Sequence, residues 1–169
     1  MTQTLYDLIR QDLNEQPDGI LESIAEARKA SMQAVLQCLS HEMAWRVDGA
    51  RFEEIWNSLT TWGDIIFIVH NRNGFFEFEG RIVPGEFGHG YFNVHGDSPI
   101  GGHFKVERCK EIYFVDRPYF GTRSCTIRFV DEDGDVMFTI SVGYTKEHSP
   151  KADQVAQFEA LRSKYKPMA

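Results

Sequence analysis

Cysteine is scarce in this chain of 169 residues, and its three cysteines are far apart. Cys38, Cys109 and Cys125 are odd in number and form no CxxC pair. This spacing argues against a disulfide framework and against a structural zinc site. Widely spaced, unpaired cysteines are typical of reduced thiols in a cytoplasmic protein. We therefore expect a fold that holds together without cross-links.

Long hydrophobic runs and an excess of basic residues are also missing. The longest apolar run, residues 65–69, is far too short to span a bilayer. The opening segment carries Asp7, Arg10 and Asp12 where a signal peptide needs apolar residues, so we expect a cytoplasmic location. The formal net charge of -7 argues against binding of nucleic acid or of anionic membranes.

Motifs for catalysis by side chains alone are not evident. The sequence has no Ser-His-Asp order, no glycine-rich phosphate loop and no paired-carboxylate pattern. Asp131, Asp133 and Asp135 resemble the beginning of a calcium loop, but the twelfth position is not glutamate. A hairpin turn is the better interpretation of these aspartates. Any catalysis would have to come from a bound cofactor.

The first 62 residues have the hydrophobic period of helices. Asp18 and Ser31 are suited to cap a second and a third helix, and Gly63 to end a fourth. The second and third helices have helix-turn-helix spacing, but SMQAVLQCL contains no Lys or Arg, which favours packing over DNA binding. The residues expected to point inward are Leu5, Leu8, Ile9, Leu21, Ile24, Ala25, Val35, Leu36, Leu39, Phe52, Ile55, Trp56 and Leu59.

From residue 63 to residue 145 the period changes to that of strands. Asn73-Gly74 marks a tight hairpin turn, and residues 131–134 mark another. Pro150 opens a last amphipathic helix over 150–166. Helices followed by an antiparallel meander and a final helix predict an α+β fold in one domain, residues 1–169.

Four of the six histidines fall in this strand region: His70, His89, His95 and His103. Phenylalanine, glycine and β-branched residues surround them. Neutral imidazole is a common axial ligand of haem iron, so the pattern favours a flat, apolar ligand with a metal at its centre, and haem is the first candidate. The gaps between the histidines do not match the HxH or HxxxH spacing of zinc and non-haem iron sites.

His103 and His70 are the sharpest candidates. In GHFKVERC, His103 and Lys105 share one strand face, which would place an imidazole for iron beside an ammonium for a propionate. His70 ends a buried strand, where ligands are often met. Tyr91, on a face with His95, could bind ferric iron or a propionate. From the residues alone, plainer explanations are more frequent: a surface histidine beside a surface lysine for His103, a polar residue that closes a strand for His70, and a half-buried strand face for Tyr91.

The segments WGDIIFIVH, GHGYFNVHG, GGHFKVERC and FVDRPYFGTRSCTIRFVDEDGDVMFTISVG resemble the cytoplasmic haem-utilisation carrier family, the HutX/ChuX family, in order and spacing. The resemblance covers most of the chain. It implies a split β-barrel-like sheet, a homodimer, and haem-contacting histidines that carry over onto His70 and His103. It also implies a weaker carry-over of Tyr91 as a ligand or neighbour. The function implied is that of a cytosolic haem carrier in iron acquisition, which passes haem to a haem-degrading acceptor or to apo-proteins.

The chain departs from the family pattern late in the sheet. Thr139 stands where the family often has Lys, and Tyr144-Thr145 stands where it often has Arg-Asp. If those basic groups hold propionates, either Lys105, Arg117 or Arg72 serves instead, or haem is held more loosely in this chain. Two further functions remain open: a haem-degrading enzyme that uses an external electron donor, and a regulator that acts through the N-terminal helices. The fold also tolerates other flat ligands, such as flavins.

Overall fold

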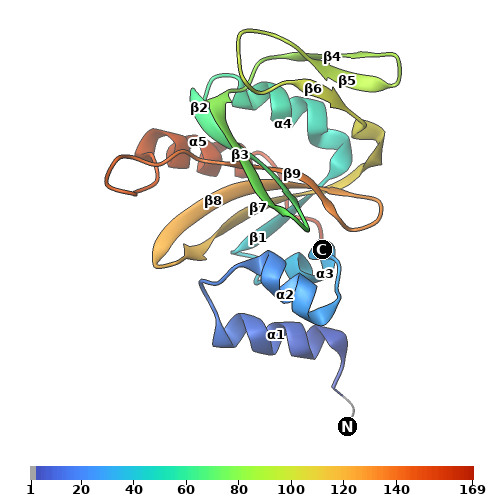
Figure 1. The fold of residues 1–169 in the computed structure, drawn as a ribbon, viewed down its shortest axis with the longest axis vertical. Coiled ribbons are helices and arrows are strands. Elements are labelled where there is room, and N and C mark those ends of the chain that lie inside the picture. Colours follow the sequence, from blue (N-terminus) through green and yellow to red (C-terminus); the bar gives the residue numbers. More distant parts are fainter. Residues whose placement is uncertain (1–2) are drawn as a thin grey trace.

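The computed structural model describes residues 3–169 and confirms the α+β class. Within these residues, six antiparallel strands form the central sheet in the order β1-β7-β8-β9-β2-β3 (Figure 1). Tight hairpins connect β2 to β3, β7 to β8 and β8 to β9, so the long meander that the sequence predicts builds most of this sheet. The strands are β1 (Ala44–Asp48), β2 (Asp64–Asn71), β3 (Gly74–Arg81), β7 (Cys109–Tyr119), β8 (Thr122–Asp131) and β9 (Val136–Ser141).

A smaller antiparallel sheet is inserted between β3 and β7. It consists of β4 (Gly85–Gly88), β5 (Tyr91–Val94) and β6 (Gly102–Phe104). Phe104 packs against Phe67 of β2, with ring centroids 6.1 Å apart, and against Phe138 of β9 at 5.2 Å. The small sheet therefore covers part of one face of the large sheet, at the top of Figure 1.

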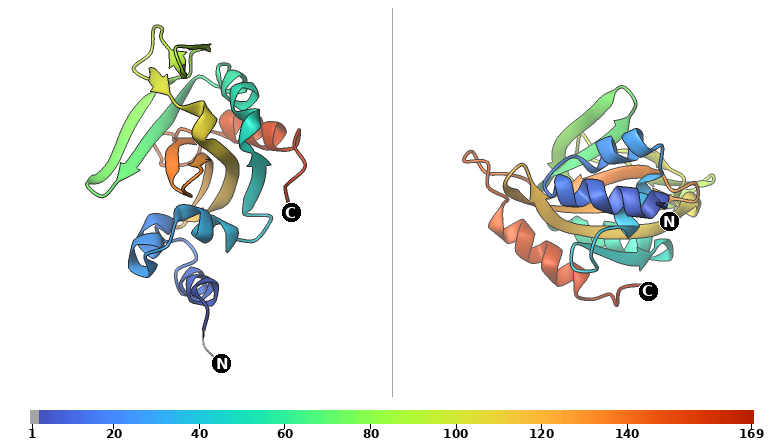
Figure 2. Two further views of the ribbon diagram at one scale, coloured as in Figure 1. Left: turned by 90° about the vertical axis from the view of Figure 1, so that its right-hand side faces the viewer. Right: turned by 90° about the horizontal axis from the view of Figure 1, so that it is seen from below.

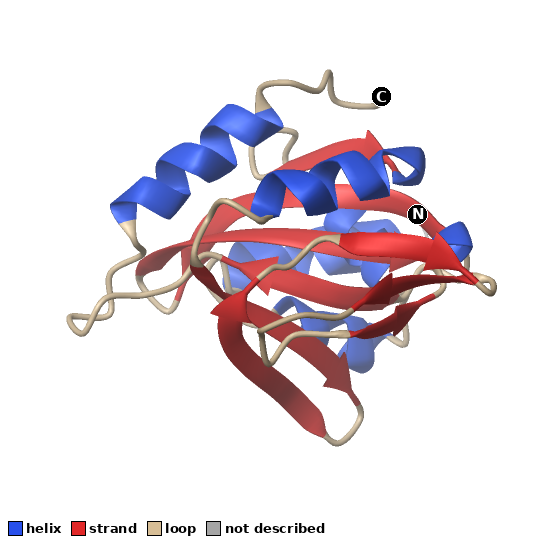
Figure 3. Ribbon diagram, turned by 90° about the horizontal axis from the view of Figure 1, so that it is seen from above, coloured by secondary structure: helices blue, strands red, loops and turns tan. Residues whose placement is uncertain are grey.

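Five α-helices of the described chain lie on both sides of the strands (Figure 3). Ser31 caps α3 as expected, because its hydroxyl accepts from the N–H of Ala34. Asp18 does not cap α2, whose N-cap is Ile20; its carboxylate accepts from the N–H of Gly121 instead. The helices are α1 (Leu5–Glu15), α2 (Leu21–Arg28), α3 (Met32–Gln37), α4 (Phe52–Leu59) and α5 (Ala152–Arg162).

The large sheet separates two hydrophobic clusters. On one face, α4, α5 and the small sheet bury a cluster around Phe52, Trp56 and Phe129. On the other face, α1, α2 and α3 bury a second cluster around Ile9 and Val35. Figure 2 shows these three helices together on one side of the strands, well away from β4–β6. Each face of the sheet therefore has its own covering layer.

No strand is expected from the sequence before residue 63, and β1 differs from that expectation. Its five residues pair with β7 from Ala44↔Val115 to Asp48↔Glu111. Ala44 and Val47 are buried, and the strand's short length hides the alternation that would reveal it. Pairing with the long edge of β7 stabilises β1, and this long-range contact is not encoded in the local sequence.

Candidate functional site

The outer surface of the small sheet carries most of the candidate residues. Phe92 and Val94 of β5 are fully buried, so the alternation of a strand turns Tyr91 and Asn93 outward. Asn93 pairs in register with His103 of β6, which places His103 on the same outer surface. We call this surface the His103 face, and define it by Tyr91, Asn93, His95, His103 and Lys105.

The side chains of the His103 face contact one another closely. Nδ1 of His103 lies 2.6 Å from Oδ1 of Asn93, a short hydrogen bond. The ring centroid of His103 lies 5.1 Å from that of His95 and 6.0 Å from that of Tyr91, both in edge-to-face geometry. Nζ of Lys105 lies 5.7 Å from the centroid of Tyr91, a cation–π distance. An exposed imidazole, a phenol and an ammonium thus occupy one small surface.

The local path of the chain after His103 differs from the expected strand. β6 ends at Phe104, and Val106–Arg108 forms a 3-10 turn before β7 begins at Cys109. The chain must cross here from the small sheet to the large one, so Lys105 does not alternate with His103 along one strand. The expected neighbourhood is nevertheless present, because the turn brings Lys105 over Tyr91.

His70 lies at the end of β2, on the face of the large sheet that α1–α3 cover. Ile65, Phe67 and Val69 of the same strand point toward the other cluster, so alternation turns His70 to the helical side. His70 pairs with Phe75 of β3, and their ring centroids are 4.4 Å apart. Phe75 is 46% exposed, so an accessible imidazole lies beside an accessible aromatic ring.

A buried ion pair lies on the same side of the sheet as His70. The guanidinium of Arg128 on β8 lies 2.5 Å from the carboxylate of Glu22 on α2. Burial is the largest single influence and opposes ionisation of Glu22, but the charge of Arg128 and the hydrogen bonds to the carboxylate together outweigh it and hold the pKa of Glu22 below its usual value. His70 makes a smaller contribution that also lowers the pKa of Glu22.

Arg128 also stands beside one of the positions where the chain departs from the family pattern. It pairs in register with Thr139, and Thr139 pairs with Ile68 of β2. The sequence alone did not single out Arg128, because residue 128 and residue 139 become neighbours only through the pairing of β8 with β9. The structure thus supplies a basic group next to Thr139, although Glu22 neutralises it.

Arg117 is buried and engaged within the protein. Its guanidinium donates to the carbonyl oxygens of Gly19 and Pro17, both at 2.9 Å, and so ties β7 to the loop between α1 and α2. Only 5% of the residue is exposed. Burial lowers the pKa of Arg117, and the nearby charge of Arg128 adds to that effect. Arg72, by contrast, is exposed at the β2–β3 turn.

The two histidines implied as haem contacts do not converge within one chain. His70 faces the helical side of the large sheet, whereas His103 faces outward from the small sheet on the other side. The small sheet meets the β2–β3 hairpin near Arg81, whose Nε donates to the carbonyl of Asp97. His70 lies about 20 Å farther along β2. Among residues 3–169, no three His, Cys, Asp or Glu side chains cluster as a metal site.

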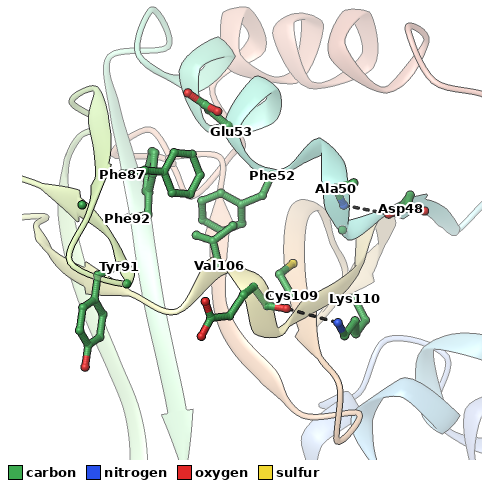
Figure 4. Close-up of a pocket in the computed structure, with 14 residues that line it drawn as sticks. Asp48, Ala50, Phe52, Glu53, Phe87, Tyr91, Phe92, Val106, Cys109 and Lys110 are labelled. Carbon is green, nitrogen blue, oxygen red and sulfur yellow. Dashed lines mark hydrogen bonds between the residues drawn. The ribbon is translucent and has the colours of Figure 1, made fainter.

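A cavity of about 530 Å³ lies beside the His103 face without including its histidines. Figure 4 shows Phe52, Phe87, Phe92 and Val106 pointing toward its centre, while the Tyr91 side chain points away. We do not assign the haem ligands to this cavity, because imidazole is absent from its lining. It instead accounts for the high exposure of Phe87, at 59%.

The comparison with known families identifies the family to which this arrangement belongs. A model described as haem utilisation ChuX/HutX matches residues 45–161, which include both sheets and both histidines. The chain belongs to the haem utilisation ChuX/HutX family. The match begins within β1 and ends within α5, so it spans both sheets together with α4 and most of α5.

One relative compared by sequence and two solved structures support the same family. The intracellular heme transport protein HutX of Vibrio cholerae is 28% identical over 165 residues, which cover 97% of this chain and 86% of HutX. A protein of Agrobacterium tumefaciens is 36% identical with a TM-score of 0.86, over 96% of this chain and 92% of its own. The heme-binding protein ChuX is 29% identical with a TM-score of 0.83, over 92% and 97% of the two chains.

The remaining sequence candidates of this ChuX/HutX family member have simpler placements. His89 occupies the β4–β5 turn with a positive φ of 54° and is exposed. Asp131 caps its own hairpin, because its carboxylate accepts from the N–H groups of Asp133 and Asp135. No helix within residues 3–169 is both long and apolar enough to cross a membrane.

Proposed function

We propose that this protein is a cytosolic haem carrier that works as a homodimer. Haem is its cargo: the protein receives imported haem, shields it, and passes it to a haem-degrading acceptor or to apo-proteins. Family membership supports the ligand class, since HutX is a heme transport protein and ChuX a heme-binding protein. The proposal assigns the chain no chemistry of its own beyond binding and release.

The observation that carries this proposal is the His103 face. His103 is an exposed imidazole, and imidazole is a common axial ligand of haem iron. Tyr91 is 38% exposed beside it and supplies aromatic surface for a porphyrin edge. Lys105, next to Tyr91, is placed to pair with a propionate.

His70 is proposed as the second iron ligand, supplied by the other protomer. Because His70 and His103 face opposite sides of one chain, a haem held by both needs two chains. Exposed aromatic rings accompany each of them, Phe75 beside His70 and Tyr91 beside His103. These rings would lose exposure if a porphyrin and a second protomer covered them, which favours binding at a dimer edge.

The basic residues proposed to contact the propionates differ in how freely they can reach a ligand. Lys105 is exposed and able to reach a ligand. Arg117 was expected to do the same from the sequence, but its terminal nitrogens are bound to Gly19 and Pro17. A propionate at Arg117 would therefore have to displace a loop, so the proposal gives the larger role to Lys105.

Titration of the apo-protein with hemin tests the proposal. We expect a saturable Soret band for the wild type and a weakened, shifted band for the variant that combines His70→Ala with His103→Ala. His41→Ala is a matched control, because His41 is exposed in the turn before β1, at the opposite edge of the large sheet from β2 and β3. A double variant that binds hemin like the wild type would contradict the site assignment.

The carrier role is separated from haem degradation by the fate of the bound haem. Incubation of the complex with a reductant and oxygen, with catalase present, should leave the porphyrin intact. Subsequent addition of an excess of apo-globin should then recover the haem. Formation of a biliverdin-like product in substantial yield would favour the enzyme instead.

A further inference from the structure

Three backbone carbonyl oxygens fix the orientation of the Asn93 side-chain amide. Nδ2 of Asn93 lies 3.0 Å from the carbonyl oxygen of Gly88, 3.3 Å from that of Glu86 and 3.4 Å from that of Tyr91. Carbonyl oxygens accept hydrogen bonds and cannot donate them, so the group that faces all three must be the NH₂ of the amide. The reversed amide would place Oδ1 against three acceptors.

The fixed amide leaves one group for His103. Oδ1 of Asn93 is the atom that faces the imidazole, at 2.6 Å from Nδ1. Because Oδ1 can only accept, Nδ1 of His103 must carry the proton and donate it. The lone pair of the neutral ring is then on Nε2.

We infer that Asn93 is a positioning residue that holds His103 as its Nδ1–H tautomer and so presents Nε2 to a metal. This inference rests on the proposed function for the identity of the metal, the iron of haem. Metal-binding histidines commonly donate their second ring N–H to an oxygen acceptor, which fixes the ring orientation and strengthens the ligand. Asn93 supplies that acceptor from the neighbouring strand, in direct register with His103.

The tautomer is tested first, on the apo-protein and without haem. Long-range ¹H–¹⁵N spectra of the labelled full chain distinguish a protonated ring nitrogen from one that bears a lone pair. At a pH where His103 is neutral, we expect its Nδ1 to have the shift of a protonated nitrogen and its Nε2 that of an unprotonated one. Assignment comes from the loss of these signals in His103→Ala. The opposite pattern, or an average of the two, would overturn the inference.

Two substitutions of Asn93 test its effect on haem. Asn93→Leu removes the acceptor at similar size, and we expect mixed tautomers in the apo-protein and haem binding about 10- to 100-fold weaker. Asn93→Asp keeps an oxygen toward Nδ1, so we expect it to retain the Nδ1–H tautomer, but its second oxygen faces the three carbonyls and should lower the melting temperature. Haem binding by Asn93→Leu at wild-type strength would overturn the positioning role.

A double-mutant cycle distinguishes positioning from general stability. In a His103→Ala background, Asn93→Leu should change haem binding little, because no imidazole remains to be positioned. An equal loss in both backgrounds would mean that Asn93 acts only through the fold, and would overturn the inference. If His103→Ala itself binds haem like the wild type, the proposed ligand fails, while the apo-protein spectrum still decides the tautomer.

Discussion

His70 and His103 face away from opposite sides of the same protomer. His70 projects from the surface of the large sheet that α1–α3 cover, and His103 from the outer surface of the small sheet. A haem bound by both therefore joins two chains. Whether both histidines bind one haem therefore depends on how two chains assemble.

Mixed dimers should restore a site that neither parent has. Dimers of His70→Ala alone or His103→Ala alone contain only sites with one histidine. After unfolding, mixing in equal amounts and refolding, half of the dimers combine both variants, and one of their two sites then has both histidines. We expect about a quarter of all sites to regain the wild-type Soret spectrum. A mixture that shows only the average of the two parental spectra would contradict ligation across the dimer.

Replacement of Lys105 should weaken haem binding through its charge. Lys105→Met keeps most of the apolar stem, so we expect affinity to fall about three- to tenfold at low salt, with a smaller loss at high salt. Hemin titrations at two ionic strengths measure the effect. Lys110→Met provides the control, because Lys110 is exposed and donates to the carbonyl of Glu107 instead. Equal losses for both variants would show that only the overall charge matters.

The Glu22–Arg128 pair should contribute strongly to stability. Both side chains are only 12% exposed, so Glu22→Gln leaves the guanidinium of Arg128 poorly compensated in the interior. We expect the free energy of unfolding to fall by about 3 kcal/mol. Urea unfolding followed by tryptophan fluorescence measures the change. Glu26→Gln, on the exposed side of the same helix, should alter it little. A neutral result for Glu22→Gln would mean that water already screens the pair.

Stability should fall in acid, and two carboxylates account for part of the loss. A hydrogen bond from Arg123 lowers the pKa of Asp116 below its usual 3.8, and Arg128 lowers that of Glu22 below 4.5. A carboxylate with a lowered native-state pKa stabilises the fold fully above its unfolded-state pKa, and this contribution is lost as the pH falls through the native-state value. Urea midpoints should therefore drop below about pH 4.5. Asp116→Asn should show a shallower pH dependence, and an unchanged slope would contradict its role.

Only one of the three thiols should react in the native protein. Burial raises the pKa of Cys109 and of Cys125 to about 12, so both remain protonated and covered at pH 8. Cys38 is partly exposed, although burial also raises its pKa. An aromatic disulfide reagent should label one thiol per chain in buffer, slowly, and three in urea. Cys38→Ser should abolish the native reaction, and rapid labelling of that variant would show that the sheet opens readily.

The helices and long hairpins were predictable because their signals are local. Ser31 caps α3, and Val155, Phe158 and Leu161 form the buried stripe of α5. β1 was missed because a five-residue strand is too short to show its period and depends on β7 for its pairing. The turn after Phe104 was missed because it serves the crossing between two sheets, which no local residue pattern announces.

The candidate site was likewise predictable only in part from the sequence. The sequence indicates His70, His103, Tyr91 and Lys105 as residue types, but it cannot show that the two histidines point away from each other. The sequence indicates only that Asn93 lies on the same strand face as Tyr91 and His95. Its contact with His103 depends on the pairing of β5 with β6 across a loop. Arg128 becomes a neighbour of Thr139 only through the pairing of β8 with β9.

The presence of a separate hydrophobic cluster on each face of the sheet has a consequence for local unfolding. The cluster under α1–α3 is the smaller of the two, and these helices can loosen as a unit while the cluster around Trp56 stays intact. Such opening would free the surroundings of His70, since Glu22 and the loop held by Arg117 belong to that layer. The His103 face rests on the larger cluster and would keep its geometry. Under the proposed function, the two histidines therefore belong to layers of different local stability, and opening of the α1–α3 layer would be a route for haem release.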